Sequence, residues 1–297
     1  MAFHFKKKES PTKAVRRLGR ERIGKALDQL QKCDRLEAIH SVRKEVKKVR
    51  AVLGLIREKT GGNTYRKGVK TLRAAGRLLR DARDAHVRPR TLERLMTHFR
   101  DRLAASSFSG IKKILRQSCQ AETREFLKGG AVARVDRMLQ KFNRRAGDLK
   151  VRAEGWGAIR LGLGESYRQG QKSLAVARKE PSPENLHQWR KHVQDLWHQL
   201  RLLCPVHPKE LRGMTDTLKQ LSQYLGDDHD LVMLWQFETR RCARWHAGEV
   251  ELMRQLNELR RKELQTEAFR LGARFYREKP SAFCRRLENY WRAWKKP

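Results

Sequence analysis

The sequence predicts an all-α protein built as two similar helical bundles. Three observations support this fold class. The few prolines fall between long stretches rich in Leu, Ala, Arg, Lys, Glu and Gln, which favour helix. Alternating runs of β-branched residues, which are typical of strands, are missing. Two sequence patterns recur in order at a nearly constant offset, which indicates an internal duplication.

Helices are expected wherever helix-forming, apolar-periodic sequence runs unbroken between loop residues. Their expected ranges are 11–33, 35–58, 65–87, 90–105, 109–128, 131–147, 157–179, 183–203, 208–224, 229–246, 248–277 and 281–294. The segment TGGNT at 60–64 is the clearest loop. In PSPEN at 181–185, Ser182 is the expected N-cap and Pro183 the first helical residue of the helix that follows.

The repeated patterns define the expected organisation of the chain. IHSVRKEV at 39–46 recurs as LHQWRKHV at 186–193, and LRAAGRLLRDARDAHV at 72–87 recurs more loosely as LKQLSQYLGDDHDLVM at 218–233. A duplication therefore predicts one bundle half over 11–147 and a second over 157–294. Residues 1–10 form a basic N-terminal arm, and its segment FHFKKK, Phe3 to Lys8, is expected to be flexible.

The charge of the chain predicts an acidic partner. The sequence has 69 Lys and Arg against 33 Asp and Glu, a formal net charge of +36. Residues 1–150 hold 41 basic and 15 acidic side chains, and residues 151–297 hold 28 and 18. Such a field repels itself unless a polyanion neutralises it. The N-terminal half is expected to bind that polyanion more strongly.

Other features exclude several classes of protein. No apolar run approaches the roughly 20 residues that a membrane-spanning helix needs, and the N-terminus lacks the apolar core of a signal peptide. The cysteines are far apart, with no C-x-x-C pair, so neither a disulfide framework nor a thiolate zinc site is expected. They are Cys33, Cys119, Cys204, Cys242 and Cys284. We expect a soluble, cytoplasmic chain.

The basic residues of the first repeated helix follow its apolar seam. With Ile39 at heptad position a, positions a and d form an unbroken apolar row through Ile56. The row next to it carries Arg43 and Arg50, and the following row His40 and Lys47. Lys44 and Lys48 lie on the expected outer face. The cationic rows therefore flank the edge of the helix that is expected to be buried.

The same arrangement recurs further along the chain. Arg73, Arg77 and Arg80 flank the seam of the helix expected near 66–84, and the second half carries a weaker set. That set contains His187, Arg190, Arg201 and Lys219. Regularly spaced Arg and Lys suit a chain of phosphates, because Arg donates bidentate hydrogen bonds to phosphate oxygens. An ordinary solvated basic face is the alternative interpretation.

The repeated [IL]-H-x-x-R-K-x-V unit, with LLRDARD and LGDDHD downstream, resembles the CHAD family, the conserved histidine α-helical domain. The resemblance covers roughly 10–290. It implies two four-helix bundles related by a pseudo-twofold axis and a basic surface that binds inorganic polyphosphate. It also implies that Lys44 and Lys191 join the site. Gln194 and Asp195 depart from the first copy, which has Lys47 and Lys48 at those positions.

No E-x-E-x-K signature of a triphosphate tunnel domain is present, so the chain is expected to be a stand-alone, non-catalytic binding module without cofactor or metal. Association with polyphosphate granules is a further expectation. The expected polyphosphate-binding residues are His40, Arg43, Lys44, Lys47, Arg50, Arg73, Arg77, Arg80, His187, Arg190, Lys191, Arg201 and Lys219.

Two other functions stay open. The same charge would serve a protein that binds the backbone of RNA or DNA, and the tryptophans of the second half could stack on bases. Trp189, at a seam position, is expected in the core instead. A metal-dependent phosphohydrolase could use His229 and Asp230, although Arg83 replaces the histidine in the first copy. Asp81, Asp84, Asp227 and Asp230 are expected to form ion pairs or helix caps.

Overall fold

The computed structural model describes residues 3–32, 35–60, 63–104, 106–239 and 247–296. Within these ranges the chain is helical and contains no strand, so the predicted all-α fold class is confirmed. The α-helices are α1 (Pro11–Lys32), α2 (Arg35–Ile56), α3 (Asn63–Leu78), α4 (Arg80–His98), α5 (Ser109–Lys128), α6 (Ala131–Ala146), α7 (Arg160–Lys179), α8 (Pro183–Leu203), α9 (Pro208–Thr239), α10 (Ala247–Phe275) and α11 (Pro280–Lys295). Short 3-10 turns lie at Arg57–Lys59, Arg100–Arg102, Gly155–Ala158 and Cys204–Val206.

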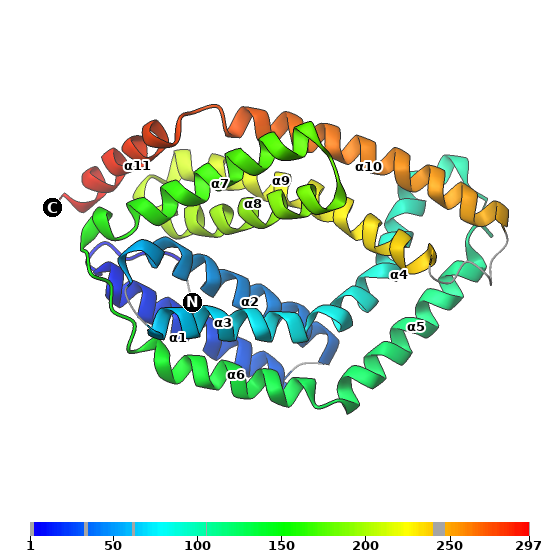
Figure 1. The fold of residues 1–297 in the computed structure, drawn as a ribbon, viewed down its shortest axis with the longest axis horizontal. Helices are drawn as coiled ribbons and strands as arrows, with labels where there is room; N and C mark the ends of the chain where they lie inside the picture. Colours follow the sequence, from blue (N-terminus) through cyan, green and yellow to red (C-terminus); the bar gives the residue numbers. More distant parts are fainter. Residues whose placement is uncertain (1–2, 33–34, 61–62, 105, 240–246, 297) are drawn as a thin grey trace.

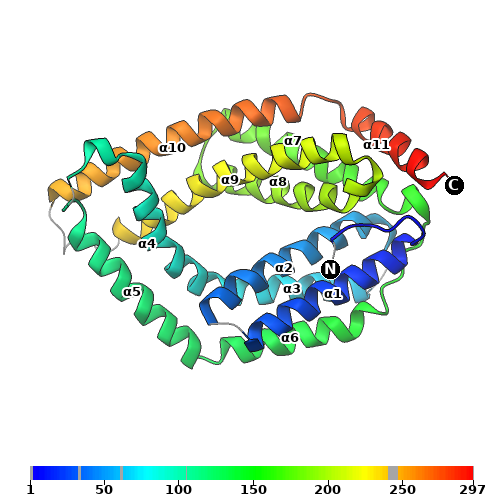
Figure 2. The same cartoon turned by 180° about the vertical axis from the view of Figure 1, so that it is seen from behind.

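The helices form two packed groups that contact each other toward both ends of the molecule. Helices α1, α2, α3 and α6 pack together, and α7 to α11 form the second group (Figure 1). Helix α2 contacts α7 and α8 across the boundary, while α4 contacts both α2 and α9. The reverse view shows α4, α5 and α10 closing the end far from the C-terminus (Figure 2). The internal duplication itself stays a prediction, as do the domain boundaries.

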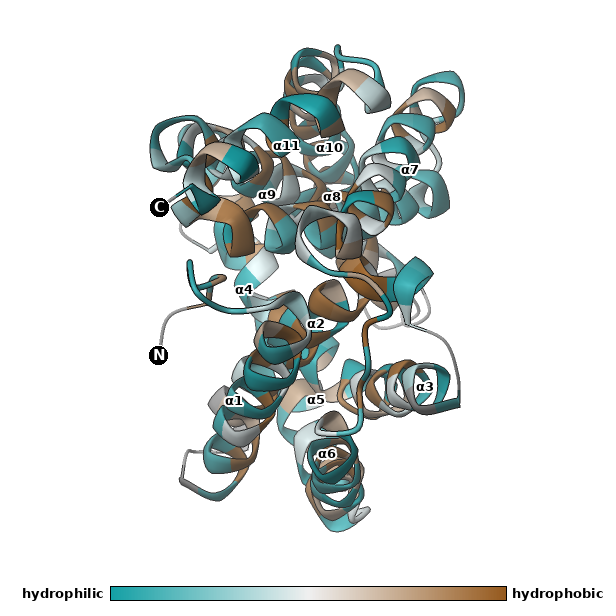
Figure 3. Cartoon of the chain, turned by 90° about the vertical axis from the view of Figure 1, so that its left-hand side faces the viewer, coloured by the Kyte–Doolittle hydropathy of each residue, from teal (hydrophilic) through white to brown (hydrophobic). Residues whose placement is uncertain are grey.

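The main hydrophobic core runs through both groups. The predicted seam of α2 is buried, with Val42, Val49 and Ile56 all at 0% exposure. The same cluster contains Trp189 and Val193 of α8. Figure 3 looks along the bundles and shows α2 lying between the two groups, with hydrophobic residues on its surface. Because the seam of α2 is covered from both sides, the cationic rows beside it lie at an interface rather than on an open face.

A smaller core lies at the end formed by α4, α5, α9 and α10. Leu92 and Phe108 of the first half pack there with Leu234 and Met253 of the second half. The two halves are therefore joined by apolar contacts at both ends of the molecule. No helix in the described ranges is long and apolar enough to cross a membrane.

Two predicted helix breaks were wrong. The break expected before residue 90 lies at Leu79, and Pro89 sits inside α4, held by the buried residues Ala85 and Leu92 on either side. The break expected between 224 and 229 does not occur, because α9 continues through GDDHD to Thr239. Packing outweighs local propensity here, since proline and glycine cost only a few kcal/mol in a helix, about 3 and 1 respectively.

Local signals were more reliable at one helix start. The hydroxyl of Ser182 accepts a hydrogen bond from the backbone N–H of Asn185 at 3.2 Å, and Pro183 begins α8, which confirms the predicted cap. In the loop predicted at TGGNT, residues 61 and 62 lie outside the described residues.

The expectation of a flexible segment at Phe3 to Lys8 was wrong. Phe3 is 8% and Phe5 1% exposed. The backbone N–H of Phe5 donates to the carbonyl of Leu202 at 3.0 Å, and its ring meets the edge of Trp291 at a centroid distance of 5.8 Å. Burial of the two phenylalanine rings stabilises the ordered segment. The adjoining lysines do not oppose this burial, because their side chains remain exposed to solvent.

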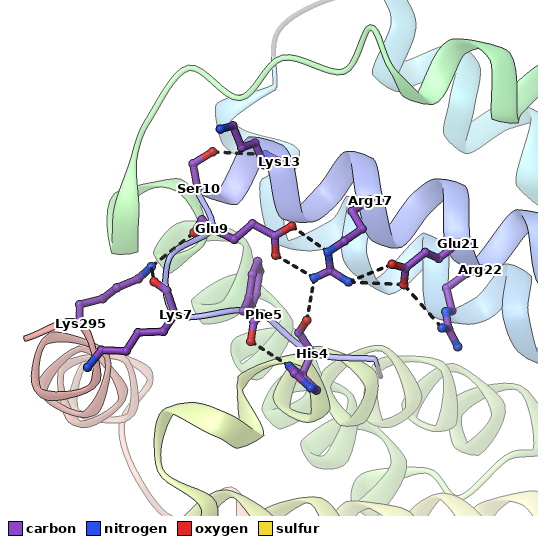
Figure 4. Close-up of polar contacts among 10 residues, drawn as sticks. All are labelled: His4, Phe5, Lys7, Glu9, Ser10, Lys13, Arg17, Glu21, Arg22 and Lys295. Atoms are coloured by element: carbon purple, nitrogen blue, oxygen red, sulfur yellow. Dashed lines mark hydrogen bonds and ion pairs between the residues drawn. The ribbon is translucent and has the colours of Figure 1, made fainter. Parts of the chain in front are cut away.

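Polar contacts hold the same segment at its other end (Figure 4). The carboxylate of Glu9 accepts two hydrogen bonds from Arg17, each of 2.7 Å. The ammonium group of Lys295 donates to the carbonyls of Lys7 and Glu9. The N-terminal segment thus ties α1 of the first group to α11 of the second.

We expect Phe5→Leu to lower the free energy of unfolding by about 1 kcal/mol, because leucine keeps most of the apolar contact and loses the ring contact with Trp291. Urea denaturation followed by circular dichroism measures the change. Lys8→Ala, an exposed change in the same segment, should stay within about 0.5 kcal/mol of the wild type. Equal stability of Phe5→Leu and the wild type would contradict the packing of this segment.

Candidate functional site

The register of α2 places two of its predicted cations at the edge of the core. Arg43 and Lys47 are partly buried, whereas Lys44 is exposed. Arg43 donates a hydrogen bond of 2.7 Å to the carbonyl of Gly76 at the end of α3. Lys48, expected on the outer face, is only 6% exposed and lies 2.6 Å from Glu45, so that expectation was wrong. The seam of α2 is covered more widely than the heptad pattern predicted.

Lys47 lies at the centre of a group of cations from three helices. Burial, together with the neighbouring charges of Arg190, Arg43, Arg83 and Arg50, lowers the pKa of Lys47 to about 7. The four neighbours that shift it most after burial are all cations. The ammonium group of Lys47 therefore loses its proton far more readily than an ordinary lysine, and a bound anion would favour the charged form.

The surrounding arginines and lysines are close enough to affect one another. Burial and then Arg83 lower the pKa of Arg43 to about 10, with Asp84 opposing the shift. The pKa of Lys191 is lowered by burial and then by Arg80 and Arg50. We call these residues of α2, α4 and α8 the cationic cluster: Arg43, Lys47, Arg50, Arg80, Arg83, Arg190 and Lys191. Residues predicted from both sequence repeats thus meet at one place.

Arg190 is the more buried of the two second-half residues in this cluster. Burial lowers its pKa, partly opposed by Asp230, and its Nε is buried without a hydrogen-bond partner. A side chain at Gly226 would place its Cβ 3.1 Å from the guanidinium of Arg190. The absence of a side chain at Gly226 therefore leaves space for Arg190. This packing explains why a residue that disfavours helix stands in the middle of α9.

Arg83 is the cluster residue that the sequence reasoning missed. It lies 3.0 Å from Asp84 and 3.0 Å from Asp230 of α9, and these carboxylates raise its pKa despite its burial. The signal was present, because Arg83 occupies the position in the first repeat that His229 occupies in the second. Its role was hidden because ion pairs between α4 and α9 depend on the fold.

The predicted ion-pairing role of the aspartates is confirmed for three of them. Asp84 and Asp230 pair with Arg83, while Asp227 lies 2.7 Å from Arg94. Asp81 forms no ion pair within the described residues and lies in the first turn of α4, where a negative charge favours the helix dipole.

The two histidines beside the cluster in the second half are neutral at physiological pH. His187 and His229 stack at a centroid distance of 4.2 Å. Burial and nearby cations lower their pKa values to about 4 and about 2 respectively. The exposed His40 also has a lowered pKa, through partial burial and then Lys44. Each neutral ring can donate one N–H to an anion without carrying charge.

Four of the residues predicted to bind polyphosphate are not members of the cationic cluster. Arg201 stands over the rings of Trp197 and Phe3, 5.3 and 5.7 Å from their centroids. Burial raises the pKa of Asp195 and the charges of Arg50, Lys47 and Arg73 oppose the shift, so Arg73 shares this acidic neighbour with two cluster residues. Arg77 and Lys219 are exposed, and neither forms an ion pair in the part of the chain that the structure describes.

The tryptophans do not offer an exposed stacking surface among the described residues. Trp189 is 0% exposed and stacks on Phe269 at 5.6 Å, which confirms its predicted place in the core. Trp245 lies outside the described residues. Among the residues that are described, no group of three or more His, Cys, Asp or Glu side chains is arranged to hold a metal ion.

One family model matches most of this chain, and two solved structures share its fold. A family model described as the CHAD domain matches residues 21–238. The crystal structure of the CHAD domain from the plant Ricinus communis is similar, with a TM-score of 0.58 and 16% identity over 94% of this chain and 90% of that one. PptA from Streptomyces chartreusis has a TM-score of 0.63 and 13% identity, covering 89% of this chain and 96% of that one. A comparison with curated proteins found no match.

Proposed function

Because the chain belongs to the CHAD domain family, we propose that it binds inorganic polyphosphate at the cationic cluster and does not turn it over. The observation that carries the proposal is the position of Lys47, which lies among cationic neighbours from α2, α4 and α8. Burial and four cationic neighbours hold its pKa at about 7, so the free protein keeps a concentrated positive charge at an electrostatic cost. A polyanion removes that cost, and repeated phosphates can contact several cluster residues at once.

The proposed contacts follow the chemistry of each side chain. Arg80 and Lys191 are exposed and offer the first contacts, while Lys47 and Arg190 lie deeper. Guanidinium groups pair with phosphate oxygens in a bidentate way, and lysines add charge. His187 can donate a hydrogen bond as a neutral ring. A polyphosphate chain that bridges α2 and α8 would contact residues from both halves of the protein.

Two observations favour binding over hydrolysis by His229 and Asp230. The carboxylate of Asp230 is engaged by Arg83 at 3.0 Å and Arg94 at 3.5 Å. The ring of His229 is stacked on that of His187 at a centroid distance of 4.2 Å. Both groups therefore already serve the packing of α4, α8 and α9. Incubation with polyphosphate and Mg²⁺ or Mn²⁺ should release no phosphate, and release that stops on adding a chelator would overturn this part of the proposal.

A competition experiment tests whether the preferred ligand is polyphosphate or a nucleic acid. Fluorescently labelled polyphosphate bound to the full chain is displaced by unlabelled polyphosphate, RNA or DNA at equal phosphate concentration and one fixed ionic strength. We expect polyphosphate to compete best, because its unbranched chain can enter the cluster without bases and no described tryptophan is exposed to stack on them. Preferential displacement by RNA would replace polyphosphate with nucleic acid as the ligand.

A further inference from the structure

A cavity of about 440 Å³ lies between α7 and α11, in the second helix group. Figure 1 shows these two helices side by side toward the C-terminal end of the molecule. Its volume falls within the range of small-molecule sites, about 300–1,000 Å³. Helix α11 begins at Pro280, beyond residue 238 where the family match ends. A segment outside the family match therefore builds one wall of the cavity.

The floor of the cavity is apolar. The two helices are in close contact at Gly164, where a Cβ would lie 2.9 Å from the Sγ of Cys284. Burial raises the pKa of the Cys284 thiol, so the thiol is neutral. Leu161 and Pro280 complete the apolar lining. Leu161 is 43% exposed, so its side chain is accessible to a ligand in the cavity.

The rim of the cavity is cationic. Arg160, Arg168 and Arg285 line it together with a single acid, Glu288. Glu288 is already 2.5 Å from Arg292, and Arg168 is 2.5 Å from Glu165. Among the described residues, Arg160 and Arg285 form no ion pair. Two guanidinium groups are therefore available to an anion at the mouth of an apolar cavity.

We propose that the cavity between α7 and α11 binds a small organic anion, with a phosphate or carboxylate head held by Arg160 and Arg285 and an apolar body against Leu161, Gly164 and Cys284. An inorganic phosphate chain has no apolar body to place against Leu161, Gly164 and Cys284, so it would use the polar lining alone and leave the apolar side chains unpaired with ligand. The site is separate from the cationic cluster, and its ligand belongs to a different chemical class.

Calorimetric titration with octyl phosphate, below the concentration at which it forms micelles, tests the proposal on the full chain. We expect saturable binding that the double variant Arg160→Ala with Arg285→Ala weakens at least tenfold. Inorganic phosphate should bind at least tenfold more weakly than octyl phosphate. The variant Ser281→Trp, which fills the cavity without a change of charge, should also abolish binding. Ser281 and both arginines are exposed, so the fold should be retained.

The matched control removes two cations elsewhere. Arg137 and Arg144 are exposed on α6, and their replacement by Ala lowers the net charge by the same amount. This control should bind octyl phosphate like the wild type, and saturating polyphosphate should leave that binding unchanged. Equal binding of octyl and inorganic phosphate, or an equal loss in the control, would overturn the proposal. Either result would leave polyphosphate binding at the cationic cluster untouched.

Discussion

Replacing Arg43, Lys47 and Arg50 together by Ala is expected to lower the affinity for inorganic polyphosphate about a thousandfold. A hydrogen bond that involves a charged group contributes about 1.5–3 kcal/mol, so the loss of three exceeds about 4 kcal/mol. Each 1.4 kcal/mol corresponds to about tenfold in the dissociation constant. Calorimetry with polyphosphate of one chain length, at one fixed ionic strength, measures the change.

The control for this triple variant separates a binding site from general attraction. Arg137, Lys141 and Arg144 are exposed on α6, and replacing them by Ala removes the same three charges. We expect this control to lose less than about tenfold in affinity for polyphosphate. Exposed cations that do not contact the ligand act on it only through an electrostatic field that salt screens. If both triple variants lost affinity equally, the cationic cluster would not be the site.

The affinity for polyphosphate is expected to fall as the pH rises above 7. The pKa of Lys47 is about 7 in the free protein. A bound polyanion stabilises the charged ammonium and raises this pKa, so binding takes up a proton. Affinity is therefore greatest below pH 7 and falls by up to about tenfold per pH unit until the pKa of the bound state is reached. Titrations at pH 6, 7, 8 and 9 follow this decline.

Lys47→Arg provides the matched variant for the pH prediction. An arginine stays protonated across this range, so its affinity should be nearly constant between pH 7 and 9. His187 and His229 cannot produce the same decline, because their pKa values lie at about 4 and about 2. Calorimetry in buffers of different ionisation enthalpy should show less proton uptake by Lys47→Arg than by the wild type, with Lys191 contributing to both. An unchanged pH dependence in Lys47→Arg would exclude Lys47 as its origin.

The same group links stability to pH with the opposite sign. The pKa of Lys47 is lower in the folded chain than the usual value of 10.5, so the unfolded chain binds more protons between pH 7 and 10.5. The contribution of Lys47 to stability is therefore unfavourable at low pH and improves as the pH rises through this window. A residue that costs stability when no ligand is bound is typical of a binding site.

The placement of the α2 residues in the cationic cluster was largely predictable from spacing alone, while their role in binding stays a prediction. The apolar seam of α2 fixed which side of the helix would be covered, and Arg43 and Lys47 followed as residues at its edge. The match between His40 and His187 also identified α8 as the second contributor. These inferences succeeded because helical periodicity determines which residues share a face before any packing is known.

Other residues could not be placed without the fold. Lys48 has the same spacing as a solvent-facing lysine, yet it is buried beside Glu45 because the N-terminal segment covers that side. Phe5 looks like part of a basic tail until Trp291 of α11 is brought next to it. Both outcomes depend on contacts between residues more than 40 positions apart, for which the local pattern carries no signal.

The sequence by itself determined that this chain is all-α, that it carries a large positive charge, and which helix faces carry its repeated cations. Only the tertiary structure decided which of those cations meet. Arg190 reaches Lys47 because α8 packs on α2, and Arg83 joins them because Asp230 of α9 holds it. Periodicity is a property of one helix, whereas a shifted pKa and a shared site arise from the crossing of several helices.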